Sequence, residues 1–130
     1  MAILIEMSRW ITYSGPTQEN WNLRWYPDRV VVRYMGSNFS DFILRNDPIL
    51  PEGLGEPGET RLHEKSYSID INQISGVVFI RRRPFLLPRL EFVAGGKKVS
   101  FYTRDKSARP LQEFQKLREF FPGRIEFSVK

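Results

Sequence analysis

The feature that most constrains this sequence is one amphipathic helical pattern that follows a series of segments with a period of two. From Leu111 to Phe121, apolar residues recur at every third or fourth position, and charged or amide side chains fill the other face. Such an apolar stripe needs a surface to cover. The sequence therefore predicts a helix near residues 107–121, with Ser107 as its N-cap, packed on a sheet formed by the preceding segments.

The segments before this helix alternate between apolar and polar residues, which is typical of half-buried strands. Strands are predicted at residues 67–71, 77–80, 90–94 and 99–103. The last two form the clearest hairpin in the chain, because Gly95-Gly96 between them accepts the positive φ angles of a tight turn.

The same alternation predicts strands nearer the N-terminus and at the C-terminal end. They cover residues 2–13, 21–25, 30–35, 39–44 and 124–129. Pro27 stands at the favoured second position of a turn between the second and third of these. The strand after the helix has two possible partners, an edge of the sheet or a second copy of the chain.

Several of these segments, in this order, resemble the pleckstrin-homology-like superfold in its short bacterial and GRAM-type versions. The resemblance is carried by Ser68–Val77, the hairpin from Leu90 to Phe101, the closing helix Leu111–Phe121 and the upstream piece Asn22–Val32. It implies a mainly β (α+β) fold: a strongly bent antiparallel sheet or partly open barrel, capped by one C-terminal amphipathic helix. It also implies a scaffold for binding, with the partner unspecified.

The length of the chain, 130 residues, is that of one domain. We predict a single domain over residues 1–130, with a mobile Pro/Gly-rich loop at about 46–64. This loop contains a G-x-G-x-x-G sequence at Gly53–Gly58, but Pro57 lies inside it, Glu56 and Glu59 would repel phosphate, and no helical pattern follows it. Because dinucleotide binding requires a strand before the motif and a helix that begins at it, we interpret the segment as a loop.

The sequence contains little that indicates catalysis. It has no cysteine, and its one histidine, His63, stands among charged residues at the end of the predicted loop. No metal-ligand spacing is present. We therefore expect no catalytic residues, no metal and no cofactor, with an enzyme that uses an unrecognised pocket as an alternative.

Charge is distributed unevenly along the chain. Residues 1–64 hold six Lys or Arg and nine Asp or Glu, a net charge of −3, whereas residues 65–130 hold fourteen and six, a net charge of +8. The densest basic feature is Arg81, Arg82 and Arg83, followed after a short apolar segment by Arg89.

That apolar segment, Phe85, Leu86 and Leu87, stands between Pro84 and Pro88. Two prolines disfavour regular strand pairing, so one prediction is an apolar loop tip ringed by arginines, which suits an anionic membrane surface. The alternative is that the apolar residues fold back under the helix and leave the arginines as a solvated strand end.

We expect a noncatalytic interaction or scaffold module that binds a protein partner or self-associates. A peripheral anionic-membrane or lipid-binding domain that uses the Arg81–Arg89 loop is the alternative. Nucleic acid is the least favoured partner, because the aromatic residues alternate as core residues do. No secretion signal or membrane span is recognisable in the sequence, so we expect a cytoplasmic protein, with the membrane periphery as the alternative location.

Overall fold

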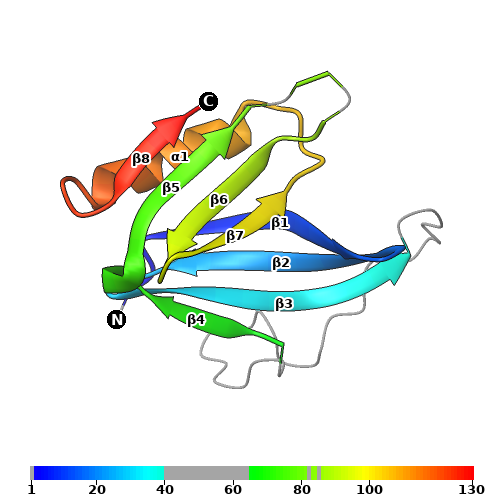
Figure 1. Cartoon of the computed structure of the whole chain (residues 1–130), viewed down its shortest axis with the longest axis horizontal. Helices are drawn as coiled ribbons and strands as arrows, with labels where there is room; N and C mark the ends of the chain where they lie inside the picture. Colours follow the sequence, from blue (N-terminus) through cyan, green and yellow to red (C-terminus); the bar gives the residue numbers. More distant parts are fainter. Residues whose placement is uncertain (1, 40–64, 82, 85) are drawn as a thin grey trace.

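The computed structural model describes residues 2–39, 65–81, 83–84 and 86–130. In chain order they form β1 (Ile5–Ser14), β2 (Thr17–Trp25), β3 (Arg29–Phe39), β4 (Tyr67–Asp70), the short 3-10 turn η1 (Ile71–Gln73), β5 (Ile74–Ile80), β6 (Arg89–Ala94), β7 (Lys97–Tyr102), α1 (Arg109–Phe120) and β8 (Glu126–Val129) (Figure 1). The prediction of a mainly β fold with one helix near the C-terminal end is confirmed.

The eight strands form one sheet in the order β4-β3-β2-β1-β7-β6-β5-β8. Strands β1 to β4 form one antiparallel meander and β5 to β7 form another. The two meanders join where Ile11 pairs with Tyr102, and they run in clearly different directions in Figure 1. Since β4 and β8 stand at opposite ends of the order, the sheet is not closed into a barrel.

Strand β8 corrects the prediction of a purely antiparallel sheet. It pairs with the edge of β5, one of the two predicted partners, but the pairing is parallel, with Val77 opposite Phe127. The connectivity explains the direction: β7 runs the same way as β5, and α1 then carries the chain back to the end of the sheet where β5 begins. A helical crossover of this kind is what parallel pairing requires.

A bulge in β1 interrupts the simple alternation that the sequence predicts there. Met7 pairs with Leu23 and Trp10 with Trp21, so β1 contains one residue more than β2 between the two pairs. Arg9 lies in this bulge with φ of 67°. The additional residue returns Trp10 to the core side, where it is buried together with Met7.

The core lies between the two meanders and α1. Trp25 packs against Phe92, with ring centroids 5.3 Å apart. From the helix, Phe114 contacts Phe79 at 5.7 Å and Phe127 at 5.8 Å. The predicted apolar stripe of the helix therefore faces the sheet.

The helix begins one residue later than the predicted N-cap implies, and Ser107 is not its N-cap. Ala108 occupies the N-cap position and its side chain makes no capping bond. Ser107 instead donates its hydroxyl to Asp105 at 2.6 Å and accepts the Arg109 amide at 3.2 Å. The side chain that organises this helix end is thus Asp105, outside the helix.

Several predictions fall on residues that the structure does not describe. They are the loop at 46–64 with its glycine motif, His63, and most of the predicted strand at 39–44, of which only Phe39 belongs to β3.

Candidate functional site

The connection between β5 and β6 is a narrow loop with a tight turn at its tip. The Leu86 amide donates to the carbonyl of Arg83 at 2.9 Å, so these residues are the first and last of a four-residue turn. Pro84 takes the second position, where its fixed φ favours the turn. The proline that disfavours strand pairing therefore also shapes the tip.

Both ends of this loop form backbone hydrogen bonds with neighbouring segments. The Arg81 amide donates to the Lys130 carbonyl at 3.1 Å, and the Lys130 amide donates in turn to Phe79 at 2.9 Å. At the other end, Pro88 accepts the Thr103 amide at 3.1 Å. The base of the loop is thus fixed by the ends of β5, β7 and β8, while its tip projects beyond them.

The tip presents an apolar side chain to solvent. Leu86 is 62% exposed, more than the other large apolar side chains of the described segments. Leu87 is half-buried. The alternative in which the whole apolar segment folds back under the helix therefore does not hold for Leu86.

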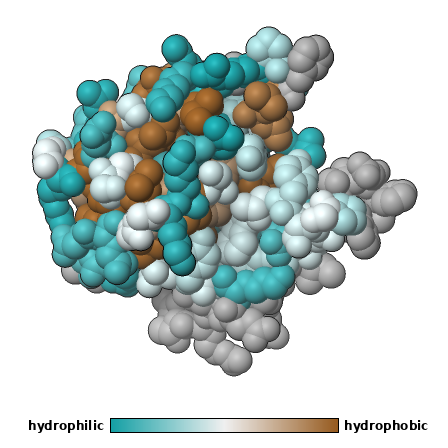
Figure 2. Space-filling view, viewed as in Figure 1, coloured by the Kyte–Doolittle hydropathy of each residue, from teal (hydrophilic) through white to brown (hydrophobic). Residues whose placement is uncertain are grey.

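Basic side chains surround an open cavity of about 370 Å³ beneath this loop. Its cationic lining, called the basic groove below, consists of Arg81, Arg83, Arg89, Lys98 and Lys130. Ile80, Leu86, Leu87 and Tyr102 provide apolar wall. The face of β5, β6 and β7 seen in Figure 2 accordingly carries apolar residues between hydrophilic ones.

One carboxylate side chain lines the groove among the residues described, and it is already paired. Glu91 lies 2.9 Å from the Arg89 guanidinium, and that guanidinium also lies 6.0 Å from the centre of the Tyr102 ring. None of the other four cations forms an ion pair with a described residue. The groove therefore carries a surplus of positive charge available to an anionic partner.

The structure brings together most of the residues that the sequence analysis singled out. Arg81, Arg83, Arg89, Leu86 and Leu87 all line the groove, whereas Arg82 and Phe85 lie outside the described residues.

Sequence reasoning grouped Lys98 with these arginines only as cations that could neutralise phosphates, and it did not predict that Lys130 lies beside the loop. Lys98 reaches the groove through the register of the β6–β7 hairpin, and Lys130 through the parallel pairing of β8. Alternation along a strand predicts which face of the sheet each side chain lies on. The order of the strands in the sheet decides that these two lysines lie beside the loop.

Candidate metal ligands do not gather in the part of the chain that the structure describes. No group of three or more His, Cys, Asp or Glu side chains there lies close enough to hold a metal ion. His63 lies outside that part.

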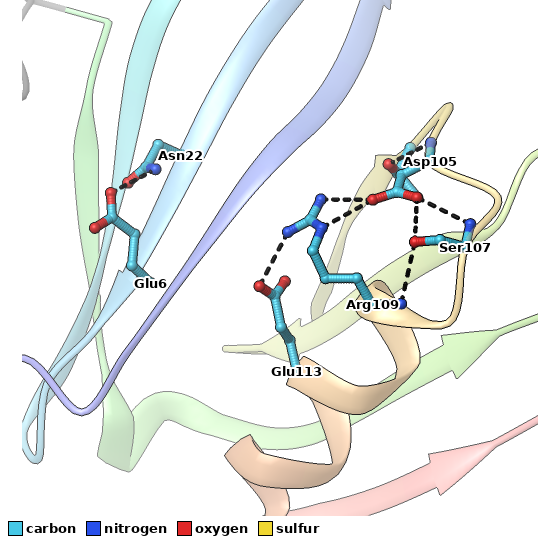
Figure 3. A network of polar contacts seen from close by, with 7 residues as sticks. Glu6, Asn22, Asp105, Ser107, Arg109 and Glu113 are labelled. Carbon is cyan, nitrogen blue, oxygen red and sulfur yellow. Dashed lines mark hydrogen bonds and ion pairs between the residues drawn. The ribbon is translucent and has the colours of Figure 1, made fainter.

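Among the residues that the structure describes, two carboxyl groups have clearly shifted pKa values, and both lie at the start of the helix (Figure 3). Hydrogen bonds from Ser107, and then from Arg109, lower the pKa of Asp105 to about 2. Burial raises the pKa of Glu113, against the opposing effect of Arg109, which lies 3.0 Å away. Asp105, Ser107 and Arg109 bond to one another, and Arg109 also binds Glu113, so the network has a structural explanation.

None of the helices in the described segments is long and apolar enough to cross a membrane. No protein-family model matches the sequence, and a search of curated proteins finds no similar sequence.

Proposed function

We propose that this chain is a noncatalytic binding module and that the basic groove, together with Leu86, docks on an anionic membrane surface. The observation that carries the proposal is the combination of an exposed leucine at an anchored loop tip with cations around its base. In this mode, apolar side chains enter the interface while basic side chains meet the headgroups.

The size of the interaction follows from the groove. Each basic side chain near an anionic leaflet contributes about 1 kcal/mol. With Glu91 offsetting one of the five cations, the electrostatic part is about 4 kcal/mol. Inserting the exposed part of Leu86 adds about 1–2 kcal/mol. The total corresponds to a Kd on the order of 0.1 mM, a weak and reversible association.

Vesicle co-sedimentation tests this proposal. We expect binding to vesicles containing phosphatidylserine and none to vesicles of phosphatidylcholine alone. Raising the salt concentration from 0.1 M to 1 M should weaken binding, because the screening length falls from about 10 Å to about 3 Å.

A pair of matched double variants makes the test specific to the groove. Arg81→Ala with Arg83→Ala should weaken binding by about 30-fold, since two headgroup contacts are lost. Lys116→Ala with Arg118→Ala removes the same charge from exposed positions on α1, which lies behind β5 and β8 in Figure 1, and should leave binding nearly unchanged. Equal losses in both pairs, or no binding of the intact chain to anionic vesicles, would contradict the proposal.

A protein partner or a second copy of the chain is a second candidate, favoured by the two ends of the sheet. The outer edges of β4 and β8 pair with no other strand in the described structure. Such edges offer backbone donors and acceptors to another strand. Light scattering across a wide concentration range tests self-association: a constant monomer mass would exclude it, whereas a rising mass would support it.

We also propose that the fold is a pleckstrin-homology-like one. The antiparallel meander β1–β4, the second meander β5–β7 and the helix that follows it support this assignment. The added strand β8 is a departure from the shortest members of that superfold. A fold of this kind is compatible with many partners, so the proposed function depends on the groove itself.

A further inference from the structure

A second cavity, separate from the basic groove, lies where β1 and β2 meet the segment between β7 and α1. Its volume is about 600 Å³, which is within the range of small-molecule sites. Three cations line it, Arg9, Arg104 and Lys106, and its apolar wall includes Ile11, Trp21 and Met35. We call it the bulge cavity, because Arg9 lies in the β1 bulge.

Arg104 is held over the cavity wall by neutral partners. One of its terminal nitrogens donates to the Tyr13 hydroxyl at 2.8 Å, and its Nε donates to the Gln18 side-chain oxygen at 3.2 Å. A guanidinium has five N–H donors. These two bonds therefore fix its position while leaving its charge and most of its donors for another group.

One carboxylate, Asp105, also lines the cavity, but its contacts are to residues other than these three cations. Asp105 accepts the amide and hydroxyl of Ser107 through one oxygen, and Arg109 binds its other oxygen at 2.8 Å. Arg9, Arg104 and Lys106 form no ion pair with the residues that the structure describes. The cavity is thus positively charged at its rim.

The bulge is what presents Arg9 at this place. Arg9 has the one positive φ among the described residues other than glycine. A non-glycine residue in this conformation is strained. The additional residue keeps Met7 and Trp10 in the core and leaves Arg9 exposed beside the cavity, as bulges do when they redirect a side chain.

From this arrangement we propose that the bulge cavity binds a small phosphate monoester with an apolar body. Arg104 anchors the phosphate through its free N–H groups, and Arg9 and Lys106 complete the charge around the dianion. Planar, multidonor recognition of phosphate is the usual role of arginine. Ile11, Trp21 and Met35 pack against the apolar part of the ligand.

Phenyl phosphate serves as the probe, with inorganic phosphate, phenol and glycerol 3-phosphate for comparison. Amide and indole NMR shifts of the whole chain report both affinity and location. We expect saturable shifts at Arg9, Arg104 and the Trp21 indole with phenyl phosphate, weaker binding of inorganic phosphate, and none of phenol. Glycerol 3-phosphate resembles a lipid headgroup without an apolar body, and equal or tighter binding of it would overturn the role assigned to the apolar wall.

Variants connect the binding to the named cations. Arg104→Gln should weaken phenyl phosphate binding at least tenfold, because charge-assisted hydrogen bonds are lost. Arg104→Lys keeps the charge without the planar donors, so its affinity for phenyl phosphate should lie between those of the intact chain and Arg104→Gln. An unchanged dispersion of amide signals checks that each variant is folded.

The double variant Arg81→Ala with Arg83→Ala should bind phenyl phosphate like the intact chain, which separates this site from the basic groove. Shifts confined to residues outside the bulge cavity, no saturation by 10 mM probe, or equal affinity of Arg104→Gln would each overturn the proposal.

Discussion

Replacing Asp105 by asparagine tests how the structure holds the start of α1. The carboxylate accepts two bonds from Ser107 and an ion pair from Arg109 at 2.8 Å. These contacts lower its pKa from 3.8 to about 2, a difference equivalent to about 2.5 kcal/mol. Because the network lies near the surface, solvent screening reduces this figure, and we expect Asp105→Asn to lower the free energy of unfolding by about 1–2 kcal/mol at pH 7.

The pH dependence gives this prediction its sign. A carboxyl group whose pKa is lower in the folded state stabilises the fold above its unfolded pKa, near 3.9, and loses that contribution as the pH falls through the folded value. The stability difference between the intact chain and Asp105→Asn should therefore be constant above about pH 5 and fall to about half by pH 3.

Urea denaturation at pH 7, 5, 4 and 3 measures this difference directly. Glu119→Gln, a change at an exposed position on the same helix, serves as the control and should stay within about 0.5 kcal/mol of the intact chain. A loss that is equally large at pH 7 and pH 3, or no loss at pH 7, would refute the role assigned to the Asp105 carboxylate.

Two further substitutions test the core and the buried charge. Phe114 is fully buried, so Phe114→Ala should lower the free energy of unfolding by about 3–5 kcal/mol in thermal or urea denaturation. Phe120 is 45% exposed, and Phe120→Ala should lower it far less. Similar losses for both variants would contradict the assigned helix face. Arg33 is 2% exposed, lies 3.4 Å from the Asn22 oxygen and 4.0 Å from Glu6, and has a pKa lowered by burial and by Arg24. A buried charge with so few partners does not recover the free energy lost on its desolvation. Arg33→Met should therefore change the free energy of unfolding by less than about 1 kcal/mol or increase it. A loss above about 3 kcal/mol would contradict this reasoning.

Alternation of apolar and polar residues predicted the strands correctly where no bulge interrupts the pattern. The hairpin around Gly95-Gly96 and the stripe of α1 were predicted because the apolar residues of each element keep to one face. The β1 bulge was not predicted, since the residues before it alternate normally and the shift becomes visible only in the pairing with β2. Ser107 was predicted to be the N-cap, but the helix begins one position further on, with Ala108 as the N-cap, and the Ser107 hydroxyl bonds to both Asp105 and the Arg109 amide.

The candidate sites also depend on pairings that the sequence pattern does not predict. The basic and apolar run from Arg81 to Arg89 was visible in the sequence, and Pro84 indicated a turn. Lys130 joins that run only because β8 pairs in parallel with β5, and no local pattern encodes this choice of partner. The bulge cavity depends on contacts between Arg104 and the β1–β2 hairpin, some 90 residues apart in sequence.

A single environment-sensitive fluorophore at position 86 tests the proposed docking surface most directly. The chain contains no cysteine, so Leu86→Cys provides one labelling site at the loop tip, and Lys116→Cys on α1 provides the matched control. With phosphatidylserine-containing vesicles, the label at position 86 should shift to the blue and brighten, while the label at position 116 stays unchanged. No change at position 86, or the same change at both positions, would contradict docking through the basic groove and Leu86.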